Sequence, residues 1–402
     1  MGGQPRFSFL YVGALPPHRG GSAIVGENLL TGLARAGHKV CALAPVSDSD
    51  ADTPDDFARA HPEISLTRYR VPFYSTARSE SSTNSEYIAC ERAGIESLLP
   101  SMISQSVPDL LIIGRERIAQ QIPADICRLL PSVAILHGGN TFERLRRGMC
   151  EEVELAAALK KVDLLVGVAE HVTASLRAVG FGDVTTIPNG VDTRRFAPRA
   201  KDPELMRSMR INGSDIVAVH VSKLAGVKRP RDLIESARVA IHENPRLIYL
   251  VIGDGPCRAD MEQRCAALGL TDRFRYTGWI SHQEIPRYLN LADIVVMPSE
   301  SEGQCLVCLE AMACAKAVIT TDIAGSREII ADRETGVLVD VGDVRELARA
   351  TAWLAAHPQV RDEIGKRARI AADEHADDRV NAEYERQLIA VIERHRAASR
   401  VG

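Results

Sequence analysis

The sequence predicts an α/β protein built from two doubly wound domains, and three observations support this class. The chain has 402 residues, which is too long for one ordinary hydrophobic core. Short apolar runs alternate with longer amphipathic stretches, as in parallel sheets with crossover helices. This pattern restarts once, after the turn-rich segment 187–192 and a polar stretch over 193–215. We therefore expect domains over residues 1–192 and 193–373, followed by a terminal helix over 374–402.

The apolar runs predict seven strands in the first domain and six in the second. Those of the first domain are residues 7–12, 39–44, 65–71, 110–113, 133–136, 164–168 and 185–187. Those of the second domain are residues 216–222, 247–252, 274–277, 294–297, 317–321 and 337–339. In such sheets ligands bind beyond the carboxyl ends of the strands, so the loops that follow the strands are where site residues are expected.

Composition excludes several classes of protein. Apolar residues make up 45% and charged residues 25%, as in ordinary soluble globular proteins and unlike disordered or fibrous chains. The net charge of −4 argues against a general nucleic-acid binder, although Arg144, Arg146 and Arg147 form a local basic cluster. No run approaches the ~20 apolar residues of a membrane span, and residues 7–15 lack the flanks of a secretory signal. A cytoplasmic protein is expected, and peripheral contact with a membrane stays open.

Nine scattered cysteines, largely inside apolar runs, favour reduced buried thiols over a disulfide framework. Cys305 and Cys308 have the spacing of a redox or metal motif. No second Cys or His pair lies nearby, so we interpret these two residues as part of a loop-to-helix turn.

Glu302 and Glu310 lie eight residues apart, in a loop and in a helix predicted to start near Leu306. The loop and the helix N-terminus present backbone N–H groups, which makes them a candidate phosphate site. Two carboxylates beside a phosphate site repel the phosphate itself, so we expect them to accept hydrogen bonds from hydroxyls of the same ligand. This geometry predicts a sugar nucleotide, a ligand that carries both phosphates and hydroxyls. The alternative is an acidic surface loop followed by a solvated glutamate. The residues expected around the nucleotide are Gly303, Gln304, Cys305, Leu306 and Val307.

This segment resembles the Glu-x7-Glu segment of the retaining glycosyltransferases of family 4. Glu302-Gly303, Leu306 and Glu310-Ala-Met-Ala match that family in register, whereas Gln304-Cys305 departs from its commoner Phe-Gly or Phe-Pro. The resemblance implies the GT-B fold, in which two Rossmann-like domains face a cleft and a last helix returns to the first domain. It also implies that Glu302 binds hydroxyls of the donor sugar and that Glu310 binds the ribose.

Lys223 and Lys228 follow the first predicted strand of the second domain. Two cations there, close to the anion site, would stabilise a departing diphosphate; the alternative is a solvated basic loop. The family usually has Arg then Lys at this gap, and Lys223 provides a point charge without the guanidinium fork. This Val-Lys-Arg string and a Gly-Gly-Ser turn are most similar to the branch that makes N-acetylglucosaminyl malate.

The Gly20-Gly21-Ser22 turn follows the first strand and opens a helix expected to end near Ala36. Glycine lets a backbone approach a ligand closely, and Ser22 is predicted to cap the helix. The turn lacks the Gly-x-Gly-x-x-Gly pattern of nicotinamide-binding domains. The resemblance places Gly20 and Gly21 near the diphosphate and the acceptor.

His137 follows an apolar strand, where a lone histidine is more often structural. The family resemblance instead implies that it contacts the donor sugar next to the reacting carbon. It further implies that Gly253 and Ile280 lie beside the nucleotide. The residues expected to bind the acceptor are Ser22, Arg115, Asn140 and Arg144.

The predicted function is transfer of a hexose or N-acetylhexosamine from a nucleotide diphosphate sugar to an acceptor hydroxyl. A UDP-sugar is favoured and GDP-mannose is the alternative donor; no cofactor and no metal are expected. Asp48 and Asp50 have the Asp-x-Asp spacing of a metal motif from another glycosyltransferase fold, but their setting is typical of an acidic surface loop. Two rival functions remain, a sugar-nucleotide 2-epimerase and a non-catalytic partner that binds sugar nucleotides.

Overall fold

The computed structural model describes residues 7–18, 20–48, 50–52, 54–72, 85–123, 125–138 and 150–400. The chain forms two compact units. One runs to Gly190 and resumes at Asp377, and the other spans Val191–Ala376. The boundaries predicted from the sequence are residues 192 and 373, close to those observed.

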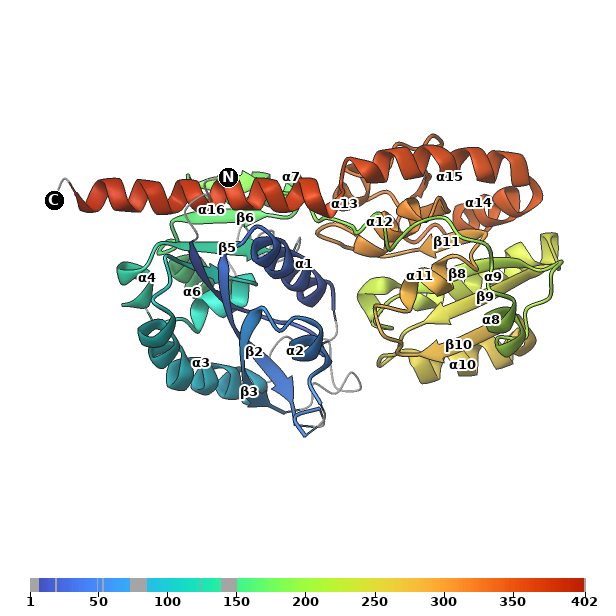
Figure 1. The fold of residues 1–402 in the computed structure, drawn as a ribbon. Helices are drawn as coiled ribbons and strands as arrows, with labels where there is room; N and C mark the ends of the chain where they lie inside the picture. Colours follow the sequence, from blue (N-terminus) through green and yellow to red (C-terminus); the bar gives the residue numbers. More distant parts are fainter. Residues whose placement is uncertain are drawn as a thin grey trace. The chain divides into compact units, whose positions relative to one another are not determined.

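The first unit contains a seven-stranded sheet in the order β3-β2-β1-β4-β5-β6-β7, and every pairing is parallel (Figure 1). Its strands are β1 Ser8–Val12, β2 Lys39–Ser47, β3 Ile64–Val71, β4 Leu110–Ile113, β5 Ser132–Leu136, β6 Leu164–Gly167 and β7 Val184–Thr186. The order reverses between β1 and β4, and this reversal is the switch point of a doubly wound sheet. Strand β2 continues beyond its predicted end because Ser47 still pairs with Val71 of β3.

Helices cover both faces of this sheet, so its strands are buried on both sides and read as nearly continuous apolar runs. The helices are α1 Gly21–Arg35, α2 Asp56–Ala60, α3 Ser85–Ser106, the 3-10 helix η1 Glu116–Gln120, α4 Ile126–Leu129, α6 Cys150–Leu159, α7 Glu170–Ala178 and α16 Asp377–Ser399. Successive side chains of β1 lie on opposite faces of the sheet. Leu10 packs in the hydrophobic cluster with α3 and α6, whereas Phe9 packs in the one with α1 and α16.

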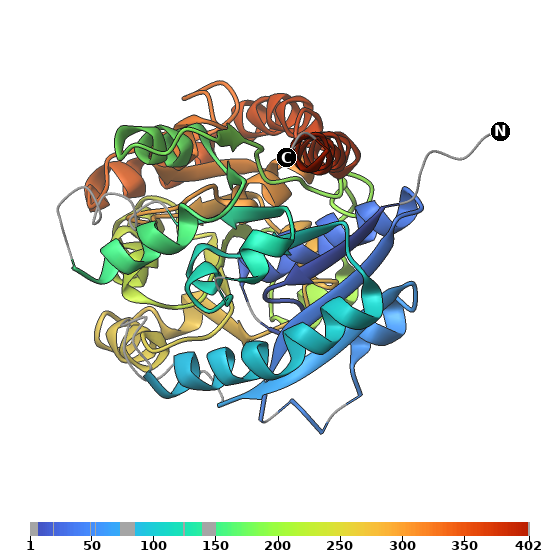
Figure 2. The same ribbon diagram turned by 90° about the vertical axis from the view of Figure 1, so that its left-hand side faces the viewer.

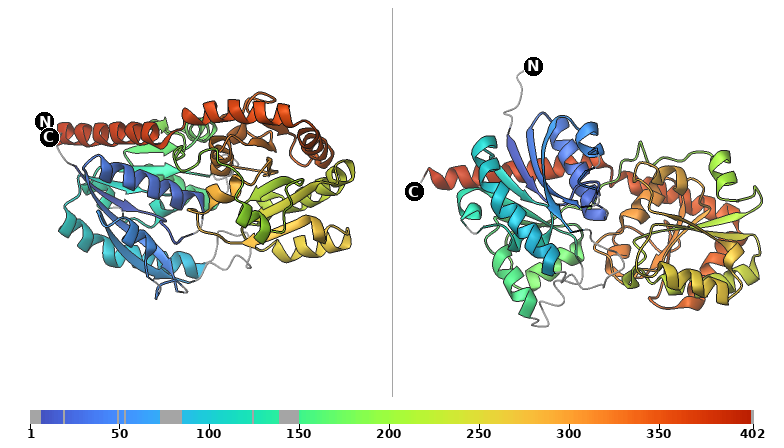
Figure 3. Two further views of the ribbon diagram at one scale, coloured as in Figure 1. Left: turned by 45° about the vertical axis from the view of Figure 1, so that its right-hand side comes forward. Right: turned by 90° about the horizontal axis from the view of Figure 1, so that it is seen from below.

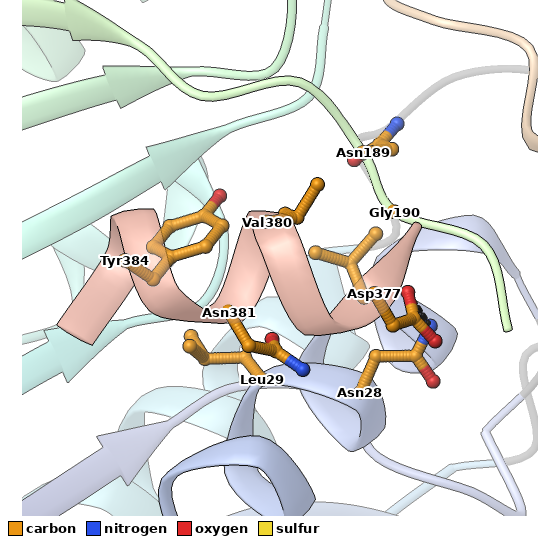
Figure 4. Close-up of a pocket in the computed structure, with 9 residues that line it drawn as sticks. Asn28, Leu29, Asn189, Gly190, Asp377, Val380, Asn381 and Tyr384 are labelled. Atoms are coloured by element: carbon orange, nitrogen blue, oxygen red, sulfur yellow. Dashed lines mark hydrogen bonds between the residues drawn. The ribbon is translucent and has the colours of Figure 1, made fainter. Parts of the chain in front are cut away.

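The last helix of the chain, α16, packs on the first unit (Figures 1 and 2). Its buried residues Tyr384, Leu388, Val391 and Ile392 share a cluster with Leu29, Leu30 and Leu33 of α1. A small pocket lies where α1, the segment at Gly190 and the start of α16 meet, and Asn28 Nδ2 there donates to Asp377 Oδ1 at 3.2 Å (Figure 4).

The second unit contains a six-stranded sheet in the order β10-β9-β8-β11-β12-β13, again parallel throughout (Figure 3). Its strands are β8 Ile216–Val221, β9 Leu247–Ile252, β10 Phe274–Gly278, β11 Ile294–Met297, β12 Ala317–Thr321 and β13 Val337–Val339. The two doubly wound sheets confirm the predicted fold class.

The helices of the second unit also lie on both faces of its sheet. They are α8 Pro203–Ser208, η2 Gly226–Lys228, α9 Pro230–Glu243, α10 Arg258–Ala267, η3 Thr271–Arg273, α11 Ile285–Leu289, α12 Leu306–Ala313, α13 Ala324–Arg327, α14 Val344–Ala356 and α15 Pro358–Asp373. One hydrophobic cluster joins the sheet to α12 and α15, and the other joins it to α9, α10 and α14. None of the helices in the described ranges combines the length and the apolar character that a bilayer-spanning helix needs.

Candidate active site

Helix α12 begins at Leu306, as the sequence predicts, and follows the loop that carries Glu302. Cys305 occupies the N-cap position with φ −76 and ψ 96, and its side chain makes no capping hydrogen bond. The first N–H groups of a helix have no partner within the helix, so this terminus has the chemistry of an anion site. Gln304 and Cys305 are buried, while Gly303, Leu306 and Val307 are half-buried.

Lys228 and Glu302 form an ion pair beside this terminus. The Lys228 Nζ donates to Glu302 Oε1 at 2.5 Å, and the two side chains are 23% and 13% exposed. Burial alone would lower the pKa of Lys228, but the attraction of the Glu302 carboxylate outweighs it and the pKa is raised. An ammonium has three donors, so Lys228 can hold Glu302 and still contact a phosphate. Lys223, on the same loop, is half-buried.

The loops after β8, β9 and β10 are tied together at the carboxyl edge of the sheet. Gly253 has φ +115, and a Cβ there would lie 2.0 Å from the Ser222 carbonyl oxygen, so only glycine fits. Its N–H donates to the Gly278 carbonyl at 2.9 Å, and the Ser222 N–H donates to Ile252 at 3.0 Å. Ile280 then packs partly buried against the core below the loop. Gly253 is therefore joined directly to the loops after β8 and β10 at this edge.

A buried histidine that the sequence analysis missed lies under this edge. His220 on β8 contacts the Val296 carbonyl through Nδ1 at 2.9 Å and the Ser222 hydroxyl through Nε2 at 2.7 Å. Burial lowers its pKa to about 4. The ring is therefore neutral at pH 7, Nδ1 carries its proton, and the Ser222 hydroxyl donates to Nε2. Within an apolar strand run, His220 has no sequence signal that separates it from a core residue.

Glu310 lies about one turn into α12 and is nearly buried, with 6% of its side chain exposed. Its Oε1 contacts His282 Nε2 at 2.6 Å, and His282 Nδ1 contacts Arg195 Nη2 at 2.7 Å. Glu310 is predicted from the sequence, whereas neither His282 nor Arg195 is. Arg195 stands in the polar stretch after the domain junction and His282 in a turn after β10, where no periodic pattern marks them.

In the first unit, the structure corrects the expectation that Ser22 caps helix α1. Helix α1 starts at Gly21 with Gly20 as N-cap, and no side chain caps it. Gly20 has φ +141, a backbone conformation that favours glycine, so it takes the cap position and leaves Ser22 inside the first turn. Gly20 and Gly21 are exposed after β1.

His137 follows β5 and is held by one side-chain carboxylate and one backbone carbonyl. Its backbone N–H donates to Glu116 Oε2 at 3.1 Å, and its ring Nε2 contacts the Gly114 carbonyl at 3.1 Å. Burial lowers the pKa of His137. Because a carbonyl oxygen only accepts, Nε2 is the protonated nitrogen and Nδ1 is left as an acceptor.

Arg115 follows β4, and its Nη2 lies 3.5 Å from the buried Glu91 carboxylate. Glu91 also accepts from Gln121 Nε2 at 3.2 Å, and burial raises its pKa. The other expected acceptor residues, Asn140 and Arg144, lie outside the described residues, as do Arg146 and Arg147.

The described residues contain no cluster of three or more His, Cys, Asp or Glu side chains that could hold a metal ion. The free thiols are those of Cys41, Cys90, Cys127, Cys257, Cys265, Cys305, Cys308 and Cys314. The interaction with Cys305 and burial raise the pKa of Cys308, which keeps that thiol protonated and unreactive. Asp50 accepts from the Ser47 hydroxyl at 2.7 Å.

Comparison with known proteins shows similarity to glycosyltransferases. The family model of the "Glycosyl transferases group 1" matches residues 201–371. N-acetyl-alpha-D-glucosaminyl L-malate synthase of Bacillus anthracis is 24% identical over 381 residues, which cover 92% of this chain and 93% of that protein. 2-Deoxystreptamine N-acetyl-D-glucosaminyltransferase of Streptomyces fradiae is 30% identical over 213 residues, covering 52% and 51%. The crystal structure of Anabaena HepE with UDP-glucose has a TM-score of 0.75 at 17% identity, covering 96% of this chain and all of that one.

The two doubly wound domains and the structural likeness to HepE show the GT-B fold. The second unit carries the match to the group 1 glycosyl transferases, over residues 201–371.

Proposed function

We propose that the protein is a retaining, metal-independent glycosyltransferase that moves a hexose or N-acetylhexosamine from a nucleotide diphosphate sugar to an acceptor hydroxyl. A UDP-sugar is the favoured donor. The observation that carries this proposal is the Lys228–Glu302 ion pair beside the N-terminus of α12, with Glu310 one turn further along the helix. Cation, helix terminus and carboxylates together supply contacts for a diphosphate and for the hydroxyls attached to it.

In the proposed reaction the acceptor oxygen bonds to the anomeric carbon as the bond from that carbon to the diphosphate oxygen breaks. The departing diphosphate oxygen takes the proton of the acceptor hydroxyl. Lys228, Lys223 and the α12 terminus stabilise the charge that develops on the diphosphate. His137 and Glu302 hold the donor sugar, and Glu310 holds the ribose.

Relatives support the choice of donor and of acceptors to test. Anabaena HepE is solved with UDP-glucose, and two similar enzymes are named for transfer involving N-acetylglucosamine, to L-malate and to 2-deoxystreptamine. We therefore propose UDP-N-acetylglucosamine and UDP-glucose as the first donors, with L-malate and 2-deoxystreptamine as the first acceptors.

The test begins with thermal shift against a panel of UDP-, GDP- and ADP-sugars, in which one nucleotide class should raise the melting temperature. The bound donor is then incubated with and without each acceptor. A glycosylated acceptor formed together with free nucleoside diphosphate supports the transferase. Release of nucleotide and an epimerised sugar without acceptor would favour a 2-epimerase. Binding without turnover under every acceptor condition would favour a non-catalytic partner.

A further inference from the structure

A chain of three polar side chains ends on Glu310. Arg195 Nη2 contacts His282 Nδ1, and His282 Nε2 contacts Glu310 Oε1. A guanidinium can only donate, so Nδ1 must accept and cannot carry a proton in this arrangement. The ring proton therefore sits on Nε2 and is donated to Glu310. The contacts define one direction of donation, from Arg195 through His282 to the carboxylate.

The turn that carries Arg195 is fixed by its own hydrogen bonds and ring contacts. Asp192 Oδ1 accepts from the backbone N–H groups of Arg194 and Arg195, each at 3.0 Å. The Phe196 ring lies 5.5 Å from the His282 ring and 4.9 Å from the Arg195 guanidinium carbon. These contacts hold the guanidinium and the imidazole in one orientation.

Arg369 on α15 links this turn to the helix that carries Glu310. Its Nη1 donates to the carbonyl oxygens of Phe196 at 2.9 Å and Thr193 at 3.1 Å. The same nitrogen donates to the Ala313 carbonyl, at the end of α12, at 2.7 Å. Glu310 is therefore supported by a connected set of side chains, Arg195, His282 and Arg369. Support of this kind can hold a binding group within a fraction of an ångström of its working position.

We propose that Arg195 and His282 are positioning residues that orient Glu310 to distinguish ribonucleotides from 2′-deoxyribonucleotides. The proposal rests on the proposed function, in which Glu310 holds the ribose. A carboxylate has about four lone-pair positions, and His282 uses one of them on Oε1. The remaining positions can accept from both vicinal hydroxyls of a ribose. A 2′-deoxy ligand would leave this nearly buried group short of one partner, which is costly.

The test is isothermal titration of the full chain with UDP, GDP and ADP and with their 2′-deoxy counterparts. For the nucleotide that binds, we expect the ribose form to bind roughly 10- to 100-fold more tightly, the range for a hydrogen bond to a charged group. His282→Leu should reduce this ratio to below about 3, mainly by weakening the ribose form. His282→Gln, whose amide N–H can replace the ring N–H, should restore most of the ratio.

His282→Asn provides the matched pair, because its amide is one methylene shorter and does not reach Glu310. It should behave like the leucine variant, and it keeps the test valid if the leucine variant does not fold. His242→Leu on the exposed side of α9 controls for loss of a histidine. Equal weakening of ribose and deoxyribose forms, or an unchanged ratio, would overturn the inference while leaving the proposed function in place. If wild type binds no nucleoside diphosphate, the proposed function fails and this inference fails with it.

Discussion

Replacing Lys228 by Ala tests the proposed chemistry most directly, because its ammonium has both a structural and a proposed catalytic role. In the structure it neutralises Glu302 at 2.5 Å. In the proposed reaction it also contacts a diphosphate whose charge grows as the sugar leaves. The variant should therefore lose stability and turnover, and the two losses can be separated.

The expected stability loss follows from the burial of the pair. Breaking a fully buried ion pair costs about 3–5 kcal/mol, and an exposed pair contributes about 0–1 kcal/mol. With side chains 23% and 13% exposed, Lys228 and Glu302 lie nearer the buried case, so we expect a loss of about 3 kcal/mol in unfolding free energy. Because the pKa of Lys228 is raised in the folded state, the ion pair contributes its full stabilisation at pH values below the usual lysine pKa. This stabilisation should be lost only as the pH rises through the raised pKa.

Lys201→Ala is the matched control. Lys201 Nζ lies 2.5 Å from Asp293 in the same unit, and the two side chains are 30% and 16% exposed. Asp293 also lies 3.6 Å from Arg361, so the control should lose somewhat less stability. Urea denaturation should thus show comparable losses, whereas kcat should fall about 10²-fold or more only in Lys228→Ala, by analogy with removal of one preorganised donor to a developing charge. Equal kcat values in the two variants, or a raised KM with unchanged kcat for Lys228→Ala, would refute the reasoning.

Four further results are expected. Glu310→Ala should weaken free nucleoside diphosphate and donor sugar alike, whereas Glu302→Ala should weaken only the sugar-bearing ligand; titration of both ligands checks this, and equal patterns would contradict the assignments. Activity should survive excess EDTA, and loss restored by Mg²⁺ or Mn²⁺ would contradict it. An α-linked donor should give an α-linked first product, seen as a small anomeric proton coupling by NMR. The pKa of His220 is lowered from 6.5 to about 4 in the native state. Between these two pH values, His220 is protonated in the unfolded state but neutral in the native state. Unfolding free energy should therefore drop by about 2 kcal/mol between pH 7 and pH 4.5, and His220→Gln should lack this drop in urea titrations at those two pH values.

The strands of both sheets could be predicted from the sequence because parallel strands buried on both faces are short continuous apolar runs between turn formers. Strands β9, β11, β12 and β13 match the predicted bounds residue for residue. The start of α12 at Leu306 was equally accessible, since a polar, glycine-containing loop gives way there to a helical apolar pattern. The capping prediction for Ser22 was wrong because Gly20 takes the N-cap conformation.

The candidate residues Glu302, Glu310 and Lys228 were found in sequence, but the tertiary structure decided which groups they meet. Lys228 and Glu302 are separated by 74 positions, and Arg195 and His282 by 87. Contacts between residues so far apart in the chain produce no periodic pattern of residue types, whereas a strand is marked by a local pattern. They arise because parallel sheets bring the carboxyl ends of distant strands to one edge, where the side chain that each loop presents depends on how the neighbouring loops fold.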